Sequence, residues 1–173
     1  MWDNYAYFMR AIMPIAEDAG VTLGLHPHDP PLSEPLGGIP RLFATFEGFK
    51  RAMDIANSPN WGLTFCLGNW TLMGRDVATA ALRYFGERGR INYVHVQAVR
   101  GTPNRFEECF FDEGDGDLFS MLQSLQDVGF TGCLVPSHLP RLAGEEVWIE
   151  GLSGQAYGIG YLTALSQVLG RQG

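Results

Sequence analysis

Apolar residues along the chain follow two spacings, one typical of helices and one typical of short buried strands. Near the N-terminus they recur every three or four residues, and the side chains on this face are Tyr5, Phe8, Met9, Ile12, Ile15 and Ala16. This spacing predicts an amphipathic helix that ends near Gly20, because glycine often follows the last turn of a helix. A continuous apolar run over 21–26 then predicts the first strand.

The same alternation of strand and helix continues to the C-terminus. Further strands are predicted at 62–66, 91–97 and 132–136, and further helices at about 45–57, 76–88, 117–128 and 157–169. Thr45, and either Asp115 or Asp117, are predicted as N-caps because their oxygens can accept from the first N–H groups of a helix. Polar loops are predicted at 27–40 and 99–114, and the first is long enough to indicate a function.

The four predicted strands are continuously apolar, a pattern typical of strands that are covered on both faces. Strands that alternate with helices predict a parallel sheet or barrel. No linker or low-complexity segment divides the sequence, so we expect a single domain over 1–173.

Composition excludes several classes of protein. The net charge of -7 argues against a nucleic-acid partner, and no apolar run reaches the ~18 residues of a membrane span. The N-terminus lacks the pattern of a signal peptide. Cys66, Cys109 and Cys133 are odd in number and widely spaced, which does not indicate a secreted disulfide framework, so a cytoplasmic location is expected. Cys109 and Cys133 are predicted to be structural.

Chemically active side chains come at the ends of all four predicted strands: His26, Cys66, His95 and the pair Ser137–His138. The carboxyl ends of parallel strands meet at one edge, where barrel enzymes have their active sites. Each residue alone has a plainer explanation, since a cysteine in an apolar strand is usually packed in the core. Their shared position favours a site for a divalent transition metal such as Zn, Mn, Co or Fe, held by two imidazoles and a thiolate.

Acidic residues elsewhere have structural explanations. Asp29 lies among prolines and suits a turn. The carboxylates between 107 and 117 are predicted to be solvated or to cap the following helix, and they are Glu107, Glu108, Asp112, Glu113, Asp115 and Asp117.

Five segments carry a resemblance to a known family. They are HPHDPP at 26–31, GGIPR at 37–41, SPNWGLTFCLG at 58–68, YVHVQ at 93–97, and FEE…GDGD from Phe106 to Asp117. In this order they resemble the C-terminal half of mannonate dehydratase, a member of the xylose isomerase-like barrels. The resemblance runs over nearly all 173 residues. A complete (βα)8 barrel takes about 250 residues. The sequence therefore predicts an α/β partial TIM barrel, a half-barrel of about four βα units with parallel strands.

The resemblance also implies residue roles and a reaction. It implies His26, Cys66 and His95 as metal ligands, His138 and Tyr157 as catalytic residues, and Asp29, Arg41 and Gln97 as substrate-binding residues. The expected metal is Mn²⁺, with Zn²⁺, Co²⁺ or Fe²⁺ as alternatives. The implied activity is that of a lyase of glucuronate catabolism, which dehydrates D-mannonate to 2-keto-3-deoxy-D-gluconate.

Two positions depart from the family pattern. Ser137 stands where the family has an aspartate ligand, which should lower the affinity for the metal. Gln97 stands where the family has an arginine, so a cation that could hold the substrate carboxylate is lost. These changes leave open a metal-dependent sugar isomerase or epimerase, or a non-catalytic truncated remnant.

Four strands of a barrel have two open edges, at 21–26 and 132–136. Open edges and an uncovered apolar face favour association. We therefore expect a homodimer or higher homo-oligomer, with pairing between the edge strands of two copies as the preferred arrangement.

Overall fold

A computed structural model describes residues 1–145 and 151–170 of the chain. The helices are α1 (Trp2–Asp18), α2 (Phe46–Ala56), α3 (Leu67–Met73), α4 (Arg75–Gly86), α5 (Leu118–Asp127) and α6 (Leu152–Gly170). The strands are β1 (Leu23–Leu25), β2 (Trp61–Cys66), β3 (Ile91–Val96), β4 (Ala98–Thr102), β5 (Arg105–Cys109) and β6 (Cys133–Pro136). The four strands predicted from the sequence are all present, and they differ from the prediction only at their ends.

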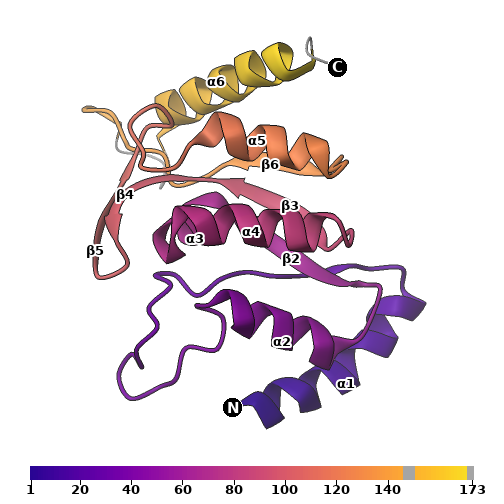
Figure 1. The fold of residues 1–173 in the computed structure, drawn as a ribbon. Helices are drawn as coiled ribbons and strands as arrows, with labels where there is room; N and C mark the ends of the chain where they lie inside the picture. Colours follow the sequence, from indigo (N-terminus) through magenta and orange to yellow (C-terminus); the bar gives the residue numbers. More distant parts are fainter. Residues whose placement is uncertain (146–150, 171–173) are drawn as a thin grey trace.

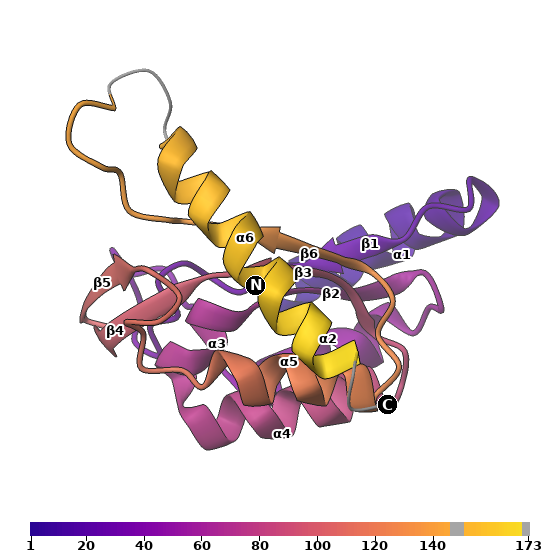
Figure 2. The same cartoon turned by 90° about the horizontal axis from the view of Figure 1, so that it is seen from above.

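Strands β1, β2, β3 and β6 form one parallel sheet in that order. The register places Cys66 beside His95, and His95 beside Val135. Helices α2, α4 and α5 lie on one side of this sheet, whereas α1 and α6 lie at its two opposite edges (Figures 1 and 2). The predicted α/β fold with parallel strands is therefore confirmed.

Within residues 1–145 and 151–170, helices cover one face of the sheet and leave the other open (Figure 1). Side chains that point toward the helices are fully buried, and they are Leu63, Phe65, Val94 and Val96. Their neighbours in the strands point the other way, and there Thr64, Tyr93 and Val135 are half-buried while Cys133 is exposed. The strand pattern alone indicated cover on both faces, which is wrong for the described residues, whereas the uncovered face expected of a half-barrel is present. Cys133, predicted to be structural, belongs to this open face, whereas Cys109 is buried.

Aromatic packing beneath the helix-covered face holds the core together. Trp70 of α3 stacks on Phe65 of β2, with ring centroids 5.0 Å apart, and also contacts Phe49 and Phe85. All four side chains are fully buried. Each such aromatic buries 150–250 Å² or so, which fixes α3 directly behind the end of β2.

Helix N-caps follow the prediction. The Thr45 hydroxyl accepts from the N–H of Gly48, and the Asp117 carboxylate accepts from the N–H of Ser120. Among the described residues, no helix is both long enough and apolar enough to cross a bilayer.

Three elements differ from the prediction. The loop predicted at 99–114 contains the antiparallel hairpin of β4 and β5, which turns at Pro103 and Asn104. Helix α3 was not predicted, because it follows β2 without an intervening loop. Helix α6 begins five residues earlier than predicted. The prediction began too late because the glycines in this segment are poor helix formers when judged from the sequence alone. Two of those glycines are required by packing, because a Cβ on Gly154 or Gly158 would clash with the segment around Leu139.

Candidate functional site

Three ligand-type side chains meet at the carboxyl end of the sheet. His26 follows β1, Cys66 ends β2 and His95 lies near the end of β3. One ligand atom from each lies within 4.8 Å of the other two, and the two imidazole rings are 5.1 Å apart. Two imidazoles and one thiol are a donor set that suits a divalent transition metal. The convergence predicted from the strand ends is therefore present.

The orientation of His26 also suits a metal ligand. Its Nδ1 lies 2.7 Å from the carbonyl oxygen of Pro27. A carbonyl only accepts, so Nδ1 must carry a proton, and in the neutral tautomer this leaves the lone pair on Nε2. Backbone contacts of this kind fix the tautomer of metal-binding histidines.

Cys66 lies in a closed environment. Its thiol donates to the side-chain oxygen of Gln97 at 2.9 Å and accepts from the amide of Asn69 at 3.3 Å. Burial raises the pKa of the Cys66 thiol to about 11, although the hydrogen bonds from Asn69 oppose part of this rise. The nearby carboxylate of Asp29 adds a smaller effect in the upward direction. A metal ion would have to displace this proton to bind the sulfur.

Gln97 fills the space beside the thiol. Its side chain is almost fully buried, and its amide also donates to the carboxylate of Glu108 at 3.2 Å. Gly68 leaves room for it, because a Cβ at that position would lie 2.5 Å from the Gln97 oxygen. Gln97 therefore connects the thiol to β5.

His138 and Tyr157 each contact a carboxylate. Nδ1 of His138 lies 2.7 Å from Glu108, and the hydroxyl of Tyr157 donates to Asp112 at 2.5 Å. Burial and the Asp112 carboxylate raise the pKa of Tyr157 above its ordinary value, so its hydroxyl keeps its proton. The explanation of Glu108 and Asp112 as merely solvated charges is therefore incomplete.

Ser137 follows the last residue of β6 and is buried. The pairing of His95 with Val135 puts these two side chains on the same face of the sheet. Ser137 is two residues beyond Val135 and continues that face. A neutral hydroxyl is thus expected on the face where His26, Cys66 and His95 meet, at the position where the resemblance implies a fourth ligand.

Asp29 and Arg41 belong to the loop after β1. The guanidinium of Arg41 donates to the carbonyl oxygen of Pro30 at 2.9 Å. This hydrogen bond connects the end of the GGIPR segment to the HPHDPP segment. Arg41 also lowers the pKa of His28, after the larger effect of burial. Asp29 is exposed. Arg41 thus stabilises the loop, and the contact of either residue with a substrate stays a prediction.

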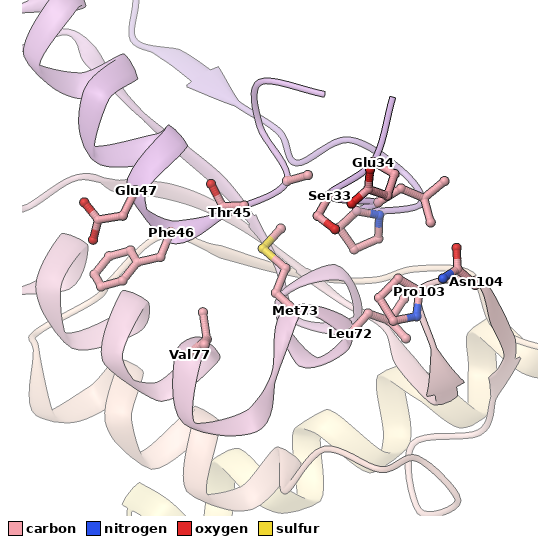
Figure 3. Close-up of a pocket in the computed structure, with 13 residues that line it drawn as sticks. Ser33, Glu34, Thr45, Phe46, Glu47, Leu72, Met73, Val77, Pro103 and Asn104 are labelled. Carbon is pink, nitrogen blue, oxygen red and sulfur yellow. The ribbon is translucent and has the colours of Figure 1, made fainter. Parts of the chain in front are cut away.

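A separate hollow of about 380 Å³ lies outside this cluster. Figure 3 shows Met73 in its middle, between Val77 on one side and Pro103 and Asn104 on the other. None of the predicted ligand, catalytic or substrate-binding residues lines it. The cluster of His26, Cys66 and His95 therefore lies outside this hollow.

Three contacts of the site involve residues that the sequence patterns did not predict as functional: Asn69, Glu108 and Asp112. Asn69 could be found from its spacing, because it is three residues after Cys66 and one helical turn brings it back to the thiol. Glu108 and Asp112 lie in the FEE…GDGD segment that carries the resemblance, but no spacing rule indicates their partners, which are 30 and 45 residues away along the chain.

Comparisons with known proteins agree with the resemblance. The family model described as D-mannonate dehydratase (UxuA) matches residues 1–172. Mannonate dehydratase 2 of Halalkalibacterium halodurans is 33% identical over 174 residues, covering 95% of this chain and 48% of the relative. The mannonate dehydratase of Thermotoga petrophila is 30% identical, covering 98% of this chain and 48% of the relative.

Solved structures give the same result. The crystal structure of mannonate dehydratase from Streptococcus suis serotype 2 matches with a TM-score of 0.90 at 32% identity, over 99% of this chain and 50% of that one. A structure of L-ribulose 3-epimerase matches with a TM-score of 0.69 at 18% identity, which shows the fold alone. The predicted partial barrel is confirmed, and the chain spans about half the length of the relatives it matches.

Proposed function

Because the chain belongs to the D-mannonate dehydratase family, we propose that it provides the metal-binding half of a hydro-lyase site. The proposed reaction of the assembled barrel is the loss of water from D-mannonate, which gives 2-keto-3-deoxy-D-gluconate. The observation that carries this proposal is the convergence of His26, Cys66 and His95 within 4.8 Å. An isomerase or epimerase has no comparable support, because the likeness to such proteins extends only to the fold.

The proposed ligands are the three residues of this cluster, and the proposed metal is Mn²⁺, although Zn²⁺, Co²⁺ or Fe²⁺ would suit the same donors. A divalent metal held there would stabilise the negative charge that develops on the sugar acid when its C2 proton leaves. Asn69 and Pro27 support the ligands from behind, through the thiol and through Nδ1 of His26.

Proton transfer is proposed for His138 and Tyr157. Dehydration needs a base for the C2 proton and an acid for the departing C3 hydroxyl, and the two side chains offer an imidazole and a protonated phenol. Asp29, Arg41 and Gln97 are proposed to form the wall of the sugar-acid pocket. Gln97 is held in that wall by the hydrogen bond that its amide donates to Glu108.

A spectroscopic titration tests the substrate class without requiring turnover. The chain loaded with Co²⁺ should change its visible d–d bands when D-mannonate is added, because the sugar-acid oxygens compete for open coordination positions. D-gluconate, which differs only at C2, should produce a weaker change, and acetate should produce the least. An unchanged spectrum at saturating D-mannonate, with Co²⁺ fully bound, would contradict the proposed substrate.

Two copies of the chain are proposed to associate through the edges of their sheets. The outer sides of β1 and β6 have no strand partner in the described chain. Helices α1 and α6 expose large apolar side chains at these same edges: Tyr7, Phe8 and Ile15 on α1, and Leu152, Ile159 and Val168 on α6. Pairing β6 of one protomer with β1 of its partner would cover both edges and bring α6 against α1.

Analytical ultracentrifugation tests this association. The protein should sediment at about twice its chain mass of 19.1 kDa. Phe8→Glu, which puts a charge on the exposed face of α1, should shift the equilibrium toward the monomer, whereas Arg10→Glu on the same helix serves as a control. A stable monomer of the parent protein at micromolar concentration would exclude the dimer.

We also propose a cytoplasmic location. Cys66, Cys109 and Cys133 are all free thiols. Thiols persist in reducing compartments, and the proposed ligand role of Cys66 requires that it stay reduced.

A further inference from the structure

We propose that Glu108 is a positioning residue that holds His138 in the tautomer with its proton on Nδ1. Its purpose rests on the proposed function, because His138 is proposed there to transfer a proton. The geometry that supports it stands independently of metal or substrate.

Glu108 is placed between two side chains. Its Oε1 lies 2.7 Å from Nδ1 of His138 and 3.2 Å from the amide nitrogen of Gln97. An ionised carboxylate only accepts hydrogen bonds, so both neighbours must present a proton to it. The Gln97 amide is itself fixed, because its oxygen accepts from the buried thiol of Cys66 at 2.9 Å. The carboxylate is therefore oriented from behind before it meets the imidazole.

The hairpin gives Glu108 a defined direction. It lies opposite Val99 in the antiparallel pair of β4 and β5, and Val99 is buried. Its neighbour Glu107 points to the other side, where it pairs with Arg100 at 2.6 Å. The two adjacent glutamates thus have different partners, and of these two Glu108 is the one that contacts His138.

The backbone of His138 supports a functional explanation. Its φ is +55°, a left-handed conformation that residues other than glycine seldom adopt. Such strained positions persist where surrounding contacts hold them, and they concentrate at functional sites. The backbone conformation of His138 determines the position of the imidazole, and Glu108 determines which ring nitrogen carries the proton.

The consequence is a distinct state of the imidazole. A neutral imidazole in water prefers its proton on Nε2, whereas the carboxylate at Nδ1 stabilises the opposite tautomer. In that tautomer Nε2 carries the lone pair and is the nitrogen able to accept a proton. Carboxylates that orient a catalytic histidine through Nδ1 act in the same way in other enzymes.

Long-range ¹H–¹⁵N NMR spectra of the imidazoles test this proposal. The chain has four histidines, and His138→Asn identifies the signals of the fourth. At a pH where the imidazole is neutral, Nδ1 of His138 should give a pyrrole-type shift and Nε2 a pyridine-type shift. Glu108→Met should change the ratio of the two tautomers about tenfold toward Nε2–H, because a charge-assisted hydrogen bond is lost. Glu107→Met, which removes the adjacent charge, should leave the ratio unchanged.

Two results would overturn the proposal. One is a folded parent protein in which His138 carries its proton on Nε2, and the other is a Glu108→Met variant with the parent's tautomer ratio. The tautomer of the parent protein alone can overturn the proposal, so the test does not depend on whether the Glu108→Met variant folds. All spectra are recorded without metal and without sugar acid, so failure of the proposed function would leave this result intact, and the reverse also holds.

Discussion

Replacing Cys66 with alanine is expected to lower the affinity for a divalent metal by at least about a hundredfold. The change removes one of three ligands and leaves two imidazoles, which hold a metal far more weakly than a set that includes a thiolate. Titration with Co²⁺ measures the effect directly, because the parent protein should show a sulfur-to-cobalt charge-transfer band that the variant lacks.

Cys109→Ala is the matched control for this experiment. Cys109 is also a buried free thiol, but it lies at the end of β5 and is not part of the ligand cluster. Its replacement should leave both the charge-transfer band and the affinity for Co²⁺ unchanged. A Cys66→Ala variant that binds Co²⁺ as tightly as the parent would remove Cys66 from the site.

Ser137→Asp is expected to raise the affinity for Mn²⁺ about tenfold, because it adds an anionic oxygen to a neutral position. Ser137 is buried and continues the face of the sheet that carries Val135 and His95. Titration of the metal-free protein with Mn²⁺, followed by electron paramagnetic resonance of the unbound ion, measures the change.

Ser137→Asn separates charge from shape. Asparagine has nearly the same size as aspartate, but its neutral amide is a weaker ligand, so it should gain little affinity. Equal affinities of the parent and the Ser137→Asp variant would mean that position 137 does not face the metal. Equal gains from aspartate and asparagine would mean that a better fit, and not the charge, causes the effect.

The ligand cluster could be predicted from the sequence because a parallel sheet converts order along the chain into position in space. Each strand contributes its last residues to the same edge, so His26, Cys66 and His95 converge although up to 69 residues separate them. The apolar strands themselves are short and uninterrupted, and this made their positions plain.

The partners of His138 and Tyr157 could not be predicted in this way. Glu108 and Asp112 lie in an acidic stretch whose composition is typical of a solvated loop. The β4–β5 hairpin in this stretch was therefore predicted as a loop, in spite of the turn at Pro103 and Asn104. Which of two adjacent glutamates contacts the histidine depends on the alternation of side chains in β5. That alternation becomes visible only once the hairpin register is known.

The apolar pattern of the strands, taken alone, indicated more burial than the structure has, for a related reason. An apolar strand buries both faces only when something covers each of them, and the covering element need not lie in the same stretch of chain. Here helices cover one face, while residues such as Tyr93 and Cys133 stay accessible on the other. The sequence of a strand alone does not say what covers its second face.

The central claim is that the three strand-end residues hold one divalent metal, and metal analysis of the reconstituted protein tests it most directly. The purified chain is stripped with a chelator, incubated in turn with Mn²⁺, Co²⁺ and Zn²⁺, dialysed, and analysed by inductively coupled plasma mass spectrometry. We expect one equivalent of metal per chain with at least one of these ions. A protein that stays folded and retains none of the three would contradict the claim.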